Sequence, residues 1–155
     1  MSKKTTKLIY FLLFIIAVIY TAQPLIDTDM YYMIPTGEYI LKHGIPKTNP
    51  FITTEGLQIV IQNWLYCVLL AVMDNTVKLP GMYLFMVIQS YIYSILLYKL
   101  IKRKNDPILS LLCCTLAGYT LMYFNIRPEL TTTILLLIQL LALETYRNTH
   151  NKKYL

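Results

Sequence analysis

Two carboxylates separated by one residue are the first groups along the chain that could carry chemistry. Asp27 and Asp29 follow the first long apolar stretch, in the motif Asp27-Thr28-Asp29. At a boundary between membrane and water such a pair can hold a divalent cation, Mg²⁺ or Mn²⁺, or can differ in pKa enough for one carboxylate to act as a base. The same spacing also suits a helix cap with a solvated neighbour, so both interpretations stay open.

A second group joins an arginine to a carboxylate in the motif Arg127-Pro128-Glu129, between two later apolar stretches. The planar guanidinium suits phosphate, and a charge at membrane depth is a functional candidate. The alternative is an arginine that reaches the interface and pairs with Glu129. If both charged groups lie on one face of the membrane, they form a site for a lipid-linked phosphate compound.

Aromatic side chains accompany the first carboxylates. Tyr31, Tyr32 and Trp64 lie in or beside the polar stretch that follows them. Their rings could contact a sugar or a lipid, although tyrosine and tryptophan are enriched at membrane interfaces whatever the function.

The elements that must position these groups are membrane helices. The 155 residues are 56% hydrophobic and 14% charged, whereas soluble domains carry roughly 25% charged residues. This composition excludes a soluble domain, and a nucleic-acid binder with it, because the polar surface that would carry basic side chains is scarce. We expect an all-α fold: one polytopic membrane domain over residues 1–155, with about four transmembrane helices and two juxtamembrane helices in the first outer loop.

Apolar runs place these elements. We expect spans at 8–26, 81–101, 107–124 and 128–146, an outer loop at 27–56, and a juxtamembrane or re-entrant helix at 57–73. The first span is long enough to be a retained helix rather than a signal peptide. The outer loop contains an amphipathic helix that Pro35 should bend or interrupt and that His43-Gly44 should end. Its expected apolar face carries Met30, Met33, Ile34, Gly37, Ile40 and Leu41, with Thr36 on the polar side.

Charge predicts the orientation. With this topology the cytoplasmic side carries a net charge of +8 and the outer side −2, which together give the net +6 of the chain. Both termini are then cytoplasmic, in a multi-pass protein of the cell membrane. The cysteines lie in apolar runs and are predicted to be small core residues, and the two histidines lack partners at zinc-site spacing.

The order of these motifs resembles the amino-terminal part of bacterial membrane glycosyltransferases of the GT-C superfamily, of the polyprenyl-phosphate-sugar-dependent type. The matching residues are Asp27-Thr28-Asp29, Tyr31-Tyr32, the run from Thr36 to Phe51, Asn63-Trp64-Leu65 and Arg127-Pro128-Glu129. The resemblance implies transfer of a sugar from a polyprenyl-phosphate-linked donor to an acceptor at the outer face. It also implies partners: membrane lipid, and further membrane helices from another chain, because such enzymes are several times longer.

The resemblance implies residue roles as well. Asp27 would deprotonate the acceptor or help to hold a metal, with Asp29 as its partner, and Arg127 would meet the donor phosphate. Glu129, Tyr31, Tyr32 and Trp64 would be candidate substrate contacts. The alternative from another class is a small non-enzymatic membrane subunit that binds lipid or scaffolds partner helices; a transporter fragment is favoured less, since no span carries a central charge.

Overall fold

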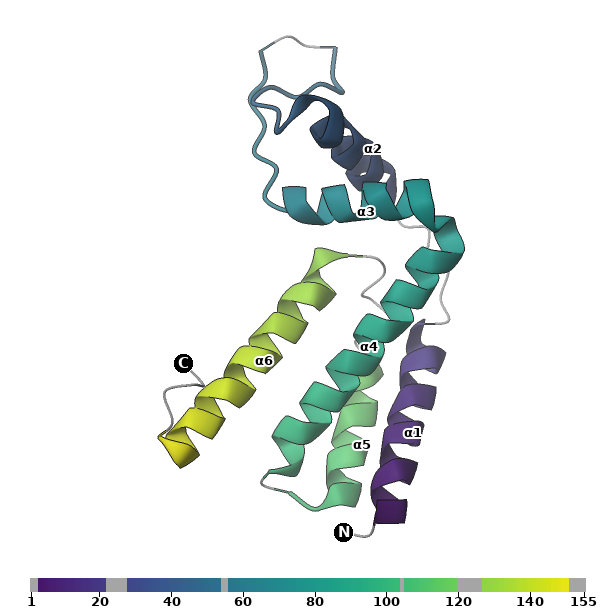
Figure 1. Ribbon diagram of the computed structural model, residues 1–155, viewed down its shortest axis with the longest axis vertical. Coiled ribbons are helices and arrows are strands. Elements are labelled where there is room, and N and C mark those ends of the chain that lie inside the picture. The colour runs from purple at the N-terminus through teal and green to yellow at the C-terminus, as the bar shows by residue number, and fades with distance from the viewer. Residues whose placement is uncertain (1–2, 22–27, 54–55, 104, 120–126, 151–155) are drawn as a thin grey trace. The chain divides into compact units, whose positions relative to one another are not determined.

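The computed structural model describes residues 3–21, 28–53, 56–103, 105–119 and 127–150. These residues contain six helices: α1 (Lys3–Thr21), α2 (Thr28–His43), α3 (Trp64–Thr76), α4 (Lys78–Lys102), α5 (Pro107–Gly118) and α6 (Pro128–Thr149) (Figure 1). The prediction of an all-helical fold is confirmed for this part of the chain. The helices belong to two compact units, one formed by residues 1–24 and 84–155 (unit 1) and one by residues 25–83 (unit 2).

Three helices are long and apolar enough to cross a membrane. They are α1, α4 and α6, with 19, 25 and 22 residues. The sequence predicted about four. The remaining span, expected at 107–124, is represented by α5, whose 12 described residues are shorter than the about 20 that a crossing needs. Its expected continuation lies outside the described residues, so a fourth crossing remains a proposal.

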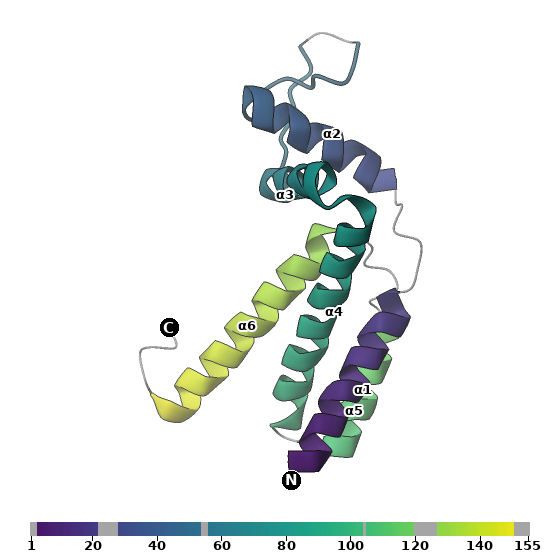
Figure 2. The same ribbon diagram turned by 45° about the vertical axis from the view of Figure 1, so that its right-hand side comes forward.

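Unit 1 is held together by two apolar clusters. One joins Tyr93 of α4 to Leu130, Ile134 and Leu137 of α6. The other joins α1, α4 and α5 through the buried residues Ile9, Leu13, Tyr98 and Cys114. Figure 2 shows α1 lying alongside α5. Within the apolar segments, the Gln89 amide of α4 donates a hydrogen bond of 2.6 Å to the Thr131 hydroxyl of α6, an interhelical polar contact of the kind that membrane bundles use.

Large apolar side chains remain exposed along the membrane-length helices. Phe11 and Ile19 of α1 are 59% and 61% exposed, and Leu135 of α6 is 61% exposed. In water this surface would be costly, whereas lipid tails cover it without penalty. The exposed apolar side chains and the lengths of the three helices therefore both indicate a membrane environment.

Unit 2 is built on close packing of α2 against α3. The buried face of α2 contains Met30, Met33, Thr36, Gly37 and Ile40, and that of α3 contains Tyr66, Cys67, Leu70 and Ala71. A methyl group at Gly37 would overlap the backbone carbonyl of Cys67 and lie 2.9 Å from Cβ of Ala71. The absence of a side chain at Gly37 therefore lets the two helices approach to backbone contact.

The amphipathic helix that was expected in an outer loop is present as α2, with two differences from expectation. The helix continues through Pro35, so the predicted interruption is absent, while the alternative, a bend at Pro35, stays a prediction. Thr36, expected on the polar side, is fully buried, because its hydroxyl donates to the Tyr32 carbonyl at 2.6 Å and needs no water. The end is as expected: Gly44 has φ +81° and donates its N–H to the Ile40 carbonyl at 2.8 Å.

The helix expected at 57–73 begins later, at Trp64, and ends at Thr76. The preceding residues pair with the loop instead: Asn49 donates its N–H to the Leu57 carbonyl at 2.9 Å, and Ile59 donates to the Lys47 carbonyl at 3.1 Å. An antiparallel bridge joins Thr48 to Gln58 between these bonds. A backbone engaged in such pairing cannot form helical hydrogen bonds as well, so the apolar run divides into a short loop ladder and a helix.

Candidate functional site

An aromatic hollow lies on the exposed face of α2. It has a volume of about 320 Å³ and is lined by Tyr31, Tyr32, Pro35 and Phe51. Phe51 belongs to the loop after α2, and its ring lies 6.2 Å from both Tyr32 and Tyr39, which are one heptad apart on the helix. The Phe51 N–H donates to the Asn49 side-chain oxygen at 3.0 Å, which fixes the local turn. The loop thus brings an aromatic ring onto a helix face that already carries tyrosines.

A second hollow shares Tyr31 and Pro35 with the first and adds a carboxylate. Its volume is about 290 Å³, and its lining includes Met30, Tyr31, Ile34, Pro35, Asp74 and Leu79. Most of these side chains are apolar, and Asp74 supplies the charge from the last turn of α3. Tyr31 is 71% exposed, so its ring can move against a bound molecule in either hollow.

Pro35 leaves one backbone carbonyl of α2 as an additional hydrogen-bond acceptor. Because Pro35 has no backbone N–H, the carbonyl of Tyr31 does not receive the hydrogen bond that a residue four positions later ordinarily donates in a helix. The Tyr31 carbonyl and the Asp74 carboxylate are both acceptors, and both residues line the second hollow. A ligand that offers hydroxyl or amine donors beside an apolar or ring face would suit it.

The other predicted residues of unit 2 are distributed around this surface. Asp29 lies in the first turn of α2 and is partly exposed. Trp64 is the first residue of α3, ten positions before Asp74, which corresponds to about 15 Å along the helix. The first hollow brings together Tyr31 and Tyr32, and the second contains Asp74, which lies at the opposite end of α3 from Trp64. Asp27, the predicted base, lies outside the described residues.

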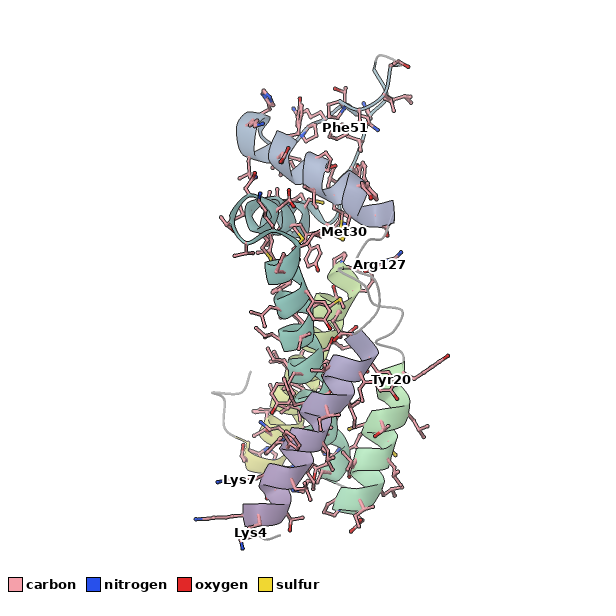
Figure 3. All side chains as sticks on the ribbon, turned by 90° about the vertical axis from the view of Figure 1, so that its right-hand side faces the viewer. Lys4, Lys7, Tyr20, Met30, Phe51 and Arg127 are labelled. Carbon is pink, nitrogen blue, oxygen red and sulfur yellow. The ribbon has the colours of Figure 1, made fainter. Side chains whose placement is uncertain are left out.

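The predicted phosphate-binding group belongs to unit 1. Arg127 precedes α6 with extended backbone, φ −126° and ψ 151°, as a residue before proline prefers. Pro128 opens the helix, and Glu129 is exposed in its first turn, where the positive end of the helix dipole favours a carboxylate. Arg127 lies at the end of unit 1 opposite to Lys4 and Lys7 (Figure 3). The guanidinium and a helix amino terminus therefore offer positive potential at one place.

The expected cation site is not assembled by the described residues alone. Among them, no three His, Cys, Asp or Glu side chains form a group that could hold a metal ion. Asp29 is the only member of the proposed pair within this part of the chain, so a divalent cation at Asp27 and Asp29 stays a prediction.

Sequence reasoning overlooked two residues of this surface, Asp74 and Pro35. In the sequence, Asp74 is a charged residue that follows an apolar run, and Pro35 was considered only as a residue that bends or interrupts a helix. The role of Pro35 could have been predicted, because a proline within a helix leaves the carbonyl four residues earlier without its usual backbone donor. The partner of Asp74 could not be found in this way, because its hollow needs α2, about 40 residues earlier in the chain.

Comparisons of the chain with protein-family models, with curated proteins and with solved structures find no match.

Proposed function

We propose that this chain is an integral membrane glycosyltransferase of the GT-C type, or the amino-terminal portion of one, which transfers a sugar from a polyprenyl-phosphate-linked donor to an acceptor at the outer face of the membrane. The observation that carries the proposal is the pair of tyrosine-lined hollows on α2, one of which contains Asp74. Both hollows belong to unit 2, which follows the membrane-length helix α1 in the chain. The Asp27-Thr28-Asp29 motif directly precedes the residues that line them.

The acceptor end of the reaction is supported by the chemistry of the second hollow. Sugar and lipid acceptors present hydroxyl donors, which the Asp74 carboxylate and the Tyr31 carbonyl can accept. The faces of Tyr31 and Tyr32 suit the apolar face of a sugar ring or a lipid chain. In this mechanism Asp27 removes the proton from the attacking hydroxyl, and Asp29 helps to set the charge of that pair.

The donor end is assigned to Arg127. As the bond between the anomeric carbon and the donor phosphate breaks, negative charge grows on the leaving phosphate, and a guanidinium stabilises that charge best where water is scarce. Arg127 directly precedes a membrane-length helix and is therefore proposed to lie near the membrane interface. The phosphate head group of a polyprenyl phosphate is expected at the same depth. Glu129, in the first turn of the same helix, is proposed to orient Arg127 or to contact the sugar.

The orientation of the proposal follows from charge. Within unit 1, basic residues lie in the amino-terminal part of α1 (Lys3 and Lys7), at or just after the carboxyl-terminal end of α4 (Lys99, Lys102 and Arg103) and in the last turn of α6 (Arg147). These helix ends lie at the same end of unit 1 (Figure 1). Positive loops favour the cytoplasmic face, so Arg127 at the other end is assigned to the outer face. The cell membrane and cytoplasmic termini belong to the same proposal.

The donor assignment predicts a binding result. Replacing Arg127 by glutamine is expected to weaken binding of an undecaprenyl-phosphate analogue by about 10- to 100-fold, because a hydrogen bond to a charged group contributes roughly 1.5–3 kcal/mol. Titration of the chain in lipid nanodiscs, followed by native mass spectrometry, measures it. The matched control is Arg147→Gln, which removes the same charge near the opposite end of α6 and should leave binding unchanged.

The two variants also separate the proposal from its rival. Equal binding by the wild-type chain and Arg127→Gln would refute the donor site. Selective binding without sugar transfer in membranes that supply any partner helices would favour a non-enzymatic, lipid-binding subunit.

A further inference from the structure

A basic cavity lies at the carboxyl-terminal end of α4, in unit 1. Its volume is about 380 Å³, and its lining combines two phenols, three cations and one leucine: Tyr10, Tyr98, Lys99, Lys102, Arg103 and Leu141. Three helices, α1, α4 and α6, contribute to it. The cavity is therefore a product of tertiary packing rather than a row of basic residues on one helix.

Tyr98 gives this cavity a polar group that needs a partner. Its side chain is 2% exposed, and its hydroxyl has no hydrogen-bond partner among the described residues. The ring is held by Tyr10, edge to face at 6.4 Å, and by the Lys102 ammonium, 5.5 Å from the ring centroid. A buried hydroxyl without an acceptor is unfavourable, so an acceptor oxygen within the cavity would be stabilised there.

The cavity also keeps an excess of positive charge. Arg103 is engaged by α6: it lies 3.2 Å from the Glu144 carboxylate and donates to the Thr145 hydroxyl at 2.9 Å. This pairing fixes the guanidinium and balances its charge. Lys99 and Lys102 also line the cavity, one turn apart at the end of α4. A cavity lined by two lysines and two tyrosines suits the oxygens of a phosphodiester.

The surroundings favour a lipid over a soluble anion. Lys99 and Lys102 occupy the last turn of a helix that is long and apolar enough to cross a membrane, which is the depth at which phospholipid phosphates lie. Leu141 lines the cavity, and the neighbouring α6 residues Ile138 and Leu140 are 48% and 41% exposed. An acyl chain can therefore follow α6 towards the membrane interior while the head group stays among the cations.

We propose that this cavity binds the phosphodiester head group of an anionic phospholipid. Lys99 and Lys102 neutralise the phosphate, and the Tyr98 hydroxyl donates to one of its oxygens. The site is independent of the proposed transferase chemistry, because the carboxyl-terminal end of α4 lies at the end of unit 1 opposite to the start of α6, which Arg127 precedes (Figure 1). Its occupation would tie α1 to α4 and α6 at one membrane interface.

The experiment compares lipid retention by the purified chain in detergent, read by native mass spectrometry. The probes are phosphatidylglycerol, zwitterionic phosphatidylcholine and inorganic phosphate. The combined variant Lys99→Gln/Lys102→Gln should lower the affinity for phosphatidylglycerol at least about tenfold, since each basic residue contributes separately near an anionic head group. The matched control Lys3→Gln/Lys7→Gln removes the same charge from exposed positions near the start of α1 that are outside the cavity lining.

The proposal predicts retention of phosphatidylglycerol over phosphatidylcholine, loss in the cavity variant and no loss in the control. Tyr98→Phe, which removes only one oxygen, should weaken retention by a few-fold while helicity stays unchanged. An equal loss in both double variants would show general surface attraction and overturn the site. Displacement of the lipid by inorganic phosphate at equal concentration would overturn the lipid assignment.

Discussion

Replacing Gly37 by leucine should separate α2 from α3 and expose the thiol of Cys67. Even a methyl group at this position would overlap the Cys67 carbonyl, and a backbone atom cannot rotate away as a side chain can. The helices must then move apart and give up the contacts of Met33, Ile40 and Leu70. Overpacking of this kind costs about 1–3 kcal/mol, and a leucine lies at the upper end of that range.

Cys67 reports this change directly. Its side chain is fully buried, and burial raises the pKa of its thiol, so at neutral pH it is both covered and protonated. In the wild-type chain, labelling by maleimide should be slow and should accelerate only as the pH rises towards that raised pKa. A loss of about 2 kcal/mol of packing would make the open state about 30-fold more populated and raise the labelling rate equally.

A neighbouring position supplies the control. Glu38 follows Gly37 and is partly exposed, whereas Gly37 is buried, so Glu38→Leu introduces the same side chain at a position that is open to the surroundings and is expected to leave the helices in contact. Site-resolved mass spectrometry distinguishes Cys67 from Cys113 and Cys114, so no cysteine needs to be replaced. Equal protection of Cys67 in the Gly37→Leu variant and the wild-type chain would contradict backbone contact between α2 and α3.

The contact at Gly37 also shows where sequence reasoning reaches its limit. The limits of α2 could be predicted because their causes are local: Gly44 adopts a positive φ that glycine accepts readily, and the apolar period is that of a helix. The role of Gly37 depends on Cys67, 30 positions later, whose distance no local pattern specifies. Helical spacing predicted an apolar face containing Gly37, but it could not predict backbone contact.

The start of α3 was missed for a related reason. Apolar residues occur on both sides of Trp64, so the run from Leu57 predicts one continuous element. The division arises because the backbone of Leu57 and Ile59 finds hydrogen bonds with Asn49 and Lys47, across a loop. The cavity at Tyr98 has the same character: its lysines are visible in the sequence, but the partner ring comes from Tyr10 on another helix.

Replacing Asp27 by asparagine is expected to reduce sugar transfer by about 10²–10⁴-fold. The proposed reaction needs a base for the acceptor hydroxyl, and loss of a positioned general base has an effect of this size. Asparagine keeps the size and the capping ability of aspartate, so membrane insertion and the burial of Cys67 should be unchanged. The measurement is the formation of glycosylated product in cells in which the variant replaces the native copy.

A second aspartate tests whether the effect is specific. Asp106 caps α5 by accepting the Ile108 N–H at 2.8 Å, a bond that asparagine can also form. Asp106→Asn therefore makes the same chemical change at the end of unit 1 where Lys7 lies, and transfer should continue at the wild-type rate. Full transfer in the Asp27→Asn variant would remove Asp27 from the catalytic role.

Kinetic constants can separate the base from the groups that hold the acceptor. A residue that acts only in the transition state changes kcat, so Asp27→Asn should lower kcat with little effect on the KM for the acceptor. Asp74 is proposed to bind acceptor hydroxyls before and during reaction, so Asp74→Asn should raise that KM and leave kcat nearly constant. If both variants changed only KM, the proton would have to leave through another group, and the hollow on α2 would be a binding site without the base.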